Sequence, residues 1–158
     1  MNKNNIYCNV KVIINKKITT TKVIIDTGNF LREPITKTPV IVLEKNILNE
    51  VIPDNVLNNL DKIIIGNDLD IGEYSSRIRI IPFKSLGKEN GILLGIKADK
   101  AIIETEERII TTKNIIIGIY NGSLSKRGKY HGLIGLEVIE NNYNDNMSFE
   151  SYKKEEKI

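Results

Sequence analysis

The stretch "KVIIDTGNFLREPITKTPVIVL", residues 22–43, joins two aliphatic runs through a segment that holds one carboxylate followed by glycine and proline. Asp26 ends the first run, directly after "KVII". Burial of a carboxylate is costly unless it is paired or hydrogen-bonded, and the aliphatic run offers no partner. Either Asp26 begins a turn, or another part of the molecule supplies the partner.

Many short β-branched runs, each bounded by Gly, Pro, Asn or charged residues, make up the chain, and they predict an all-β domain of the barrel or sandwich type. The runs are "YCNVKVII", "TTTKVIID", "PVIVL", "RIRIIPF", "GILLGI", "KAIIE", "RIITT" and "NIIIGIY". Asn15-Lys16 and Glu106-Glu107 are expected to close tight hairpins. Helix is sparse: one is predicted over 53–60 and another directly after Gly135.

The length of 158 residues suits one domain with a core of its own. We expect residues 1–140 to form that domain and the polar residues 141–158 to form a frayed C-terminal tail. The single Cys8 excludes an intramolecular disulfide, which favours a reducing compartment such as the cytoplasm. No apolar segment approaches the roughly 20 residues of a bilayer-spanning helix, so the chain as given is expected to be soluble.

Several classes of function lack the residues that they need. The formal charge of +3 is spread along the chain without interleaved aromatic residues, which argues against nucleic-acid binding. No serine-hydrolase elbow or zinc-protease motif occurs, and "GNDLDIG" lacks the glutamate of a calcium loop. His131 is interpreted as a loop histidine and Cys8 as a small buried hydrophobic residue. We therefore expect no metal and no cofactor.

The triplet Asp26-Thr27-Gly28 remains, and its plainest interpretation is a turn after a strand. Its context favours catalysis. The triplet follows the second strand of an N-terminal hairpin, and "HGLIGLEVIE" later supplies Leu133 and Ile134, then Gly135 and a short apolar helix. These two features, in this order, resemble the retroviral type of aspartic protease subunit. That chemistry needs two carboxylates, so the second must come from another copy of the chain.

A longer stretch resembles one family more closely. "DTGNFLREPITKTPVIVLEK" and "RIRIIPFKSLGKENGILLG" are similar to segments of the sporulation sigma-E factor processing peptidases of endospore-forming bacteria. The resemblance implies a retropepsin-like closed β-barrel with one or two short helices, a homodimer, and cleavage of the propeptide from a sigma-factor precursor, pro-sigma-E. The family also has an N-terminal membrane domain that is absent here. The resemblance therefore also implies that the full-length protein lies on the cytoplasmic side of the cell membrane in the sporulating cell, and that this fragment is soluble.

At a two-fold axis each Asp26 would be the partner of the other, and the pair would hold one proton between its two carboxylates. The charged member would accept a proton from water while the protonated one donates to the peptide carbonyl. Thr27, Gly28 and Asn29 complete the predicted active-site loop. Leu133, Ile134 and Gly135 are expected to pack behind that loop.

The segment from Arg77 to Gly95 is expected to form a strand, a polar turn and a second strand. Its tip, with Lys84, Ser85, Leu86 and Gly87, is a possible flap over the substrate, and the alternative is an ordinary surface hairpin. The rival class for the whole chain is a non-catalytic β-barrel protein-interaction domain whose Asp26-Thr27-Gly28 loop is only a turn. A binding module would tolerate Asp26→Asn, whereas an enzyme would not.

Overall fold

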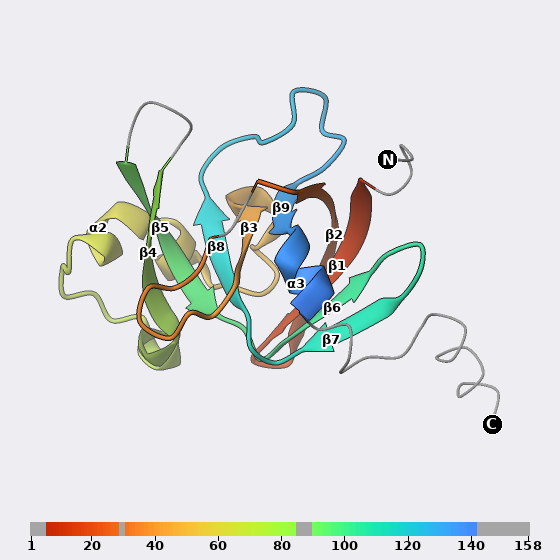
Figure 1. Ribbon diagram of the computed structural model, residues 1–158. Helices are drawn as coiled ribbons and strands as arrows, with labels where there is room; N and C mark the ends of the chain where they lie inside the picture. Colours follow the sequence, from red (N-terminus) through yellow and green to blue (C-terminus); the bar gives the residue numbers. More distant parts are fainter. Residues whose placement is uncertain (1–5, 29–30, 85–89, 142–158) are drawn as a thin grey trace.

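The computed structural model describes residues 6–28, 31–84 and 90–141, and its centre is one nine-stranded sheet (Figure 1). The order across the sheet is β4-β5-β8-β3-β9-β2-β1-β6-β7. The strands are β1 (Tyr7–Ile14), β2 (Lys17–Asp26), β3 (Val40–Glu44), β4 (Ile78–Lys84), β5 (Asn90–Lys97), β6 (Lys100–Glu104), β7 (Ile109–Thr112), β8 (Ile116–Tyr120) and β9 (Gly132–Gly135).

Each of the eight predicted apolar runs forms a strand, so the prediction of a mostly-β fold is confirmed. Asn15 and Lys16 both have positive φ, at 52° and 67°, as a two-residue turn of type I′ requires. The β6–β7 hairpin closes over Thr105 to Arg108, where the Thr105 amide donates to the Arg108 carbonyl over 2.9 Å. Both predicted hairpins are therefore present.

The helices are short. They are η2 (Lys45–Ile47), α1 (Asp54–Leu57), α2 (Leu60–Ile64), η3 (Gly72–Arg77) and α3 (Leu136–Asn141). The helix predicted over 53–60 is interrupted at Asn58 and Asn59, two residues of low helix propensity, and continues as α2. The helix predicted after Gly135 is α3. No helix among the described residues is long and apolar enough to cross a membrane.

The expectation of a closed barrel is wrong. The edge strands β4 and β7 end the sheet, and no pairing in the described part of the chain joins them. Both halves of the sheet nevertheless face one core, to which β5 contributes Ile96 and β7 contributes Ile110. The segment between β3 and β4 also enters this core, through residues such as Leu48 and Val56. The short helices of this segment therefore cover the part of the core that further strand pairing would cover in a closed barrel.

Strand β9 lies between β2 and β3 at the middle of the sheet. It runs parallel to β2, with Asp26 opposite Gly135, and antiparallel to β3. A Cβ atom on Gly132 would lie 2.4 Å from Leu43 Cδ2 and 2.6 Å from the Val42 carbonyl oxygen. Glycine at this position therefore permits β9 to fit beside β3, and β9 in turn fixes the end of β2.

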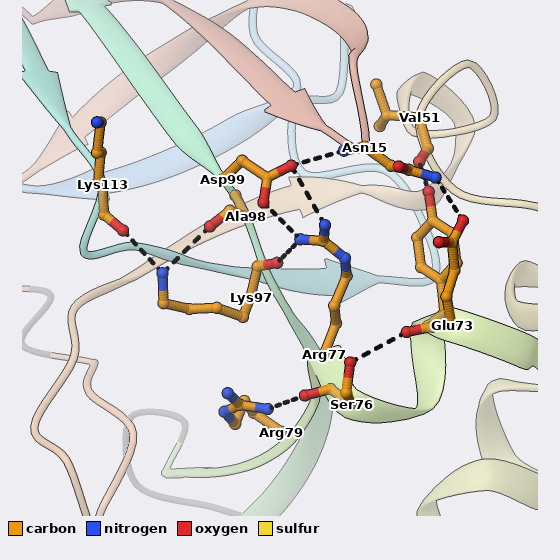
Figure 2. A network of polar contacts seen from close by, with 11 residues as sticks. Asn15, Val51, Glu73, Ser76, Arg77, Arg79, Lys97, Ala98, Asp99 and Lys113 are labelled. Atoms are coloured by element: carbon orange, nitrogen blue, oxygen red, sulfur yellow. Dashed lines mark hydrogen bonds and ion pairs between the residues drawn. The ribbon is translucent and has the colours of Figure 1, made fainter.

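A polar network holds the base of the β4–β5 hairpin (Figure 2). The Arg77 guanidinium donates to both oxygens of the Asp99 carboxylate, at 3.0 and 3.2 Å, and to the Lys97 carbonyl at 2.9 Å. The Asn15 amide donates to the same carboxylate over 2.7 Å. These hydrogen bonds lower the pKa of Asp99. The network joins the β1–β2 turn to the start of β4 and the end of β5.

We predict that Gly132→Ala destabilises the fold, because the added methyl group meets the Val42 backbone, which cannot move aside as a side chain can. Overpacking of this kind costs about 1 to 3 kcal/mol. Urea unfolding would measure the loss, with Thr20→Ala, an exposed position in β2, as the control. Equal unfolding midpoints for Gly132→Ala and wild type would contradict the assigned role of Gly132.

Candidate active site

Asp26 is the last residue of β2, and its carboxylate lies where the chain turns away from the sheet. Its Oδ1 accepts a hydrogen bond of 3.1 Å from the Gly28 amide, which is the turn interaction expected of an aspartate at a strand end. The side chain is also half-buried and lines a cleft. The turn and the cleft are thus properties of the same residue, and the turn orients the carboxylate.

The cleft has a volume of about 810 Å³. Its walls come from the Asp26 turn and the loop after it, from β4 and β5 of the hairpin, from β3 and β9, and from the end of β8 with the segment that follows it. The lining residues are Asp26, Gly28, Leu31, Arg32, Glu33, Pro34, Lys37, Val42, Pro82, Phe83, Lys84, Leu93, Tyr120, Leu124 and Leu133. Segments far apart in sequence therefore meet around one carboxylate.

Apolar side chains form the floor of this cleft. A satellite core, separate from the main one, contains Val40, Val42, Ile81, Leu93 and Ile116, with Leu31, Phe83, Tyr120, Leu124 and Leu133 packed against it. The second group is only partly buried, so its members present hydrocarbon surface to the cleft. Such a surface suits an apolar segment of a bound peptide.

Glu33 organises the loop that follows the Asp26 turn. Its buried carboxylate accepts hydrogen bonds from the Thr36 hydroxyl and the Thr36 amide, each at 2.6 Å, and from the Ile35 amide at 3.1 Å. The Thr36 hydroxyl contributes most to lowering the pKa of Glu33, followed by the Thr36 amide. The loop is therefore held from within by an ionised side chain.

Arg32 ties the same loop to α3. One guanidinium nitrogen lies 2.7 Å from Glu137 Oε2, and another donates to the Lys37 carbonyl over 2.8 Å. Because α3 follows β9 directly, this ion pair links the loop after Asp26 to β9, the strand that also pairs with β2 at Asp26. The sequence did not predict this contact, because charge was the only property that Arg32 and Glu137 showed there.

The predicted site residues are placed as follows. Thr27 and Gly28 are exposed beside Asp26, Lys84 and Leu133 line the cleft, Ile134 is fully buried in the main core, and Gly135 pairs with Asp26. The predicted hairpin from 77 to 95 is present as β4 and β5. Asn29, Ser85, Leu86 and Gly87 lie outside the described residues, so the flap remains a prediction.

His131 lies in the loop before β9, as a loop histidine should, and its ring contacts Glu44. In the residues that the structure covers, no three His, Cys, Asp or Glu side chains gather as a metal site would require. The buried thiol of Cys8 has its pKa raised to about 12 by desolvation, so it is a poor nucleophile. Asp26 therefore remains the candidate for the chemistry of the cleft.

A single carboxylate can accept a proton or donate one, but peptide hydrolysis by this route needs both acts at once. Within the described residues, the other carboxylate that lines the cleft is that of Glu33, and its oxygens are occupied by the loop. An acid–base pair at this cleft would therefore need a carboxylate besides that of Asp26. A second carboxylate brought against Asp26 would complete it.

Comparison with known proteins identifies relatives along most of the chain. The family model Peptidase_U4, described as sporulation factor SpoIIGA, matches residues 1–138. Over 133 residues the chain is 29% identical to the sporulation sigma-E factor-processing peptidase of Priestia megaterium, covering 82% of this chain and 43% of that protein. It is 28% identical over 120 residues to the protein of the same name from Bacillus subtilis, covering 73% of this chain and 39% of that protein.

The chain thus spans less than half the length of these two curated relatives. No solved structure matches it significantly.

We predict that the Glu33 carboxylate stabilises the fold at neutral pH and loses this effect in acid. Its folded pKa is lowered, so its contribution is complete above the unfolded pKa and disappears as the pH falls through the folded pKa. Glu33→Gln should therefore be less stable than wild type at about pH 7, and the difference should shrink towards about pH 3.

Urea unfolding at a series of pH values would test this, with the exposed Glu50→Gln as the matched control. A constant difference between Glu33→Gln and wild type across the series would contradict the role of the charge.

Proposed function

Because the chain belongs to the Peptidase_U4 family of sporulation factor SpoIIGA, we propose that it is one subunit of an aspartic endopeptidase. Its substrate is the precursor of a sporulation sigma factor, pro-sigma-E, from which the propeptide is removed. The observation that carries the proposal is the position of Asp26, a carboxylate oriented by its own turn at the edge of an apolar cleft. The names of the curated relatives support the choice of substrate.

Two copies of the chain form the active enzyme, with one Asp26 from each at a two-fold axis. Two adjacent carboxylates do not both ionise cheaply, so the pair holds one proton. The ionised Asp26 accepts a proton from a water molecule, and that water attacks the peptide carbonyl carbon. The protonated Asp26 donates to the carbonyl oxygen, and the product of this step is a gem-diol. No metal or cofactor takes part.

Thr27 contributes to the contact between the two subunits. Thr27 is exposed in the turn that follows β2. A hydroxyl directly beside a catalytic aspartate at a two-fold axis faces the same loop of the other copy. Gly28, which also lies exposed in this turn, lets the two backbones approach.

The substrate lies across the cleft as an extended segment. Phe83 and Lys84 of the β4–β5 hairpin form one wall, and Leu124 lies on the segment that joins β8 to β9. In the full-length protein, an N-terminal membrane domain of the kind that the sequence resemblance implies holds this domain at the cytoplasmic face of the membrane. It also raises the local concentration of subunits.

We predict that Asp26→Asn abolishes processing while the fold remains intact, since among the described residues the other carboxylate that lines the cleft, Glu33, is held by its own loop. The rate should fall by at least about a hundredfold, the contribution expected of a general acid–base group. Co-expression with the sigma-factor precursor would measure it, with Asp68→Asn, an exposed loop aspartate, as the control. Full processing by a clean Asp26→Asn preparation would contradict the catalytic role of Asp26, whereas a wild-type chain that binds the precursor without cleaving it would favour the binding-module interpretation.

We further predict that activity depends more steeply than linearly on subunit concentration and that a tandem of two linked copies is more active than the free chain. Linking adds no contact; it raises the effective concentration of the second subunit. Initial rates against enzyme concentration would test this, together with a tandem that carries Asp26→Asn in one half. A specific activity that stays constant on dilution into the monomer range would disprove the shared pair.

A further inference from the structure

Glu44 is a buried carboxylate for which the proposed reaction has no use. It ends β3, and its side chain is 5% exposed. Its Oε1 lies 2.8 Å from His131 Nδ1, and its Oε2 accepts a hydrogen bond of 2.7 Å from the Leu124 amide. Both partners come from the segment between β8 and β9, with Leu124 80 positions and His131 87 positions later in the chain. A buried charge is tolerated only when it is bonded in this way.

The Glu44 backbone takes part in the same attachment. Its amide donates to the His131 carbonyl over 2.9 Å. The Leu124 carbonyl accepts a hydrogen bond of 3.3 Å from the Tyr130 hydroxyl. Both backbone groups of Leu124 are therefore bonded, one to β3 and the other to the returning arm of its own loop.

The side chain of Leu124 indicates what this attachment does. Between Tyr120 and Tyr130 the sequence is "NGSLSKRGK", in which Leu124 is the single aliphatic residue. That side chain lines the cleft with Asp26 and packs against the satellite core. An otherwise polar loop thus presents one apolar group to the cleft, at a position fixed by a buried carboxylate.

We propose that Leu124 is a specificity-determining residue of the cleft and that Glu44 is the residue that positions it. The inference rests on the proposed function, because it concerns the peptide that the cleft binds. Leu124 contacts an aliphatic or aromatic side chain of the sigma-factor precursor near the bond that is cleaved. Glu44 acts through Leu124 and touches neither the substrate nor the reacting atoms.

Hydrogen exchange tests the positioning contact without any reference to catalysis. In Glu44→Gln the carboxamide cannot accept at both oxygen positions, so the Leu124 amide should exchange about tenfold faster, as expected when a bond to a charged group is weakened. The control is Glu104→Gln, an exposed position at the end of β6, which should leave this amide unchanged. Unchanged exchange in a folded Glu44→Gln protein would overturn the positioning role.

Kinetics with the sigma-factor precursor test the specificity role. Leu124→Ala and Glu44→Gln should each raise KM by about tenfold with little change in kcat, because uniform binding is lost. Leu124→Met should restore most of the affinity, since it returns hydrocarbon of similar volume. The double variant should be no worse than the poorer single variant, because both act through one contact.

Two outcomes would overturn the specificity role: an unchanged KM in Leu124→Ala, or a loss confined to kcat. Strictly additive effects in the double variant would overturn the claim that Glu44 acts through Leu124. Leu124→Ala decides the question even if Glu44→Gln fails to fold. A wild-type chain that does not cleave the precursor would overturn the proposed function and the specificity role together. Faster exchange at Leu124 in Glu44→Gln alone would still support the positioning contact, so the two failures can be told apart.

Discussion

The placement of Asp26 depends on how closely β9 fits between β2 and β3. Strand β9 is short, yet it pairs with β2 in parallel and with β3 in the opposite sense. Gly132 makes this possible, since a side chain there would collide with the Val42 carbonyl and the Leu43 side chain. The two strands that flank the loop after Asp26 are thereby drawn to one central strand, and the turn at Asp26 opens over the satellite core.

Hydrogen-bonded carboxylates fix the connecting segments that strand pairing does not hold in place. Glu33 organises the loop after Asp26, Glu44 holds the segment before β9, and Asp99 secures the base of the β4–β5 hairpin. In each case N–H or O–H groups donate to the carboxylate, and for the buried Glu33 and Glu44 these hydrogen bonds offset the cost of burial. Two of the three are attached to walls of the cleft, so local electrostatics shape the site as much as apolar packing does.

In the proposed reaction a single subunit is chemically incomplete. Asp26 is oriented and accessible, but its chain supplies no free second acid among the described residues that line the cleft. An enzyme assembled from two such halves can be controlled through the meeting of its subunits.

Alternation, turn residues and short motifs are local properties of a sequence. The sequence alone therefore predicted the strand positions, both hairpins, the helix after Gly135 and Asp26 as a candidate site residue. It did not predict the strand β9, since four residues bounded by glycine carry too little pattern. The prediction of a closed barrel was also wrong, because closure depends on whether the edge strands β4 and β7 pair with each other. The contacts of Glu44 with Leu124 and His131 join positions 80 and 87 residues apart. Only the tertiary structure decides such contacts, because they arise from burial in the folded chain and leave no local periodicity to read.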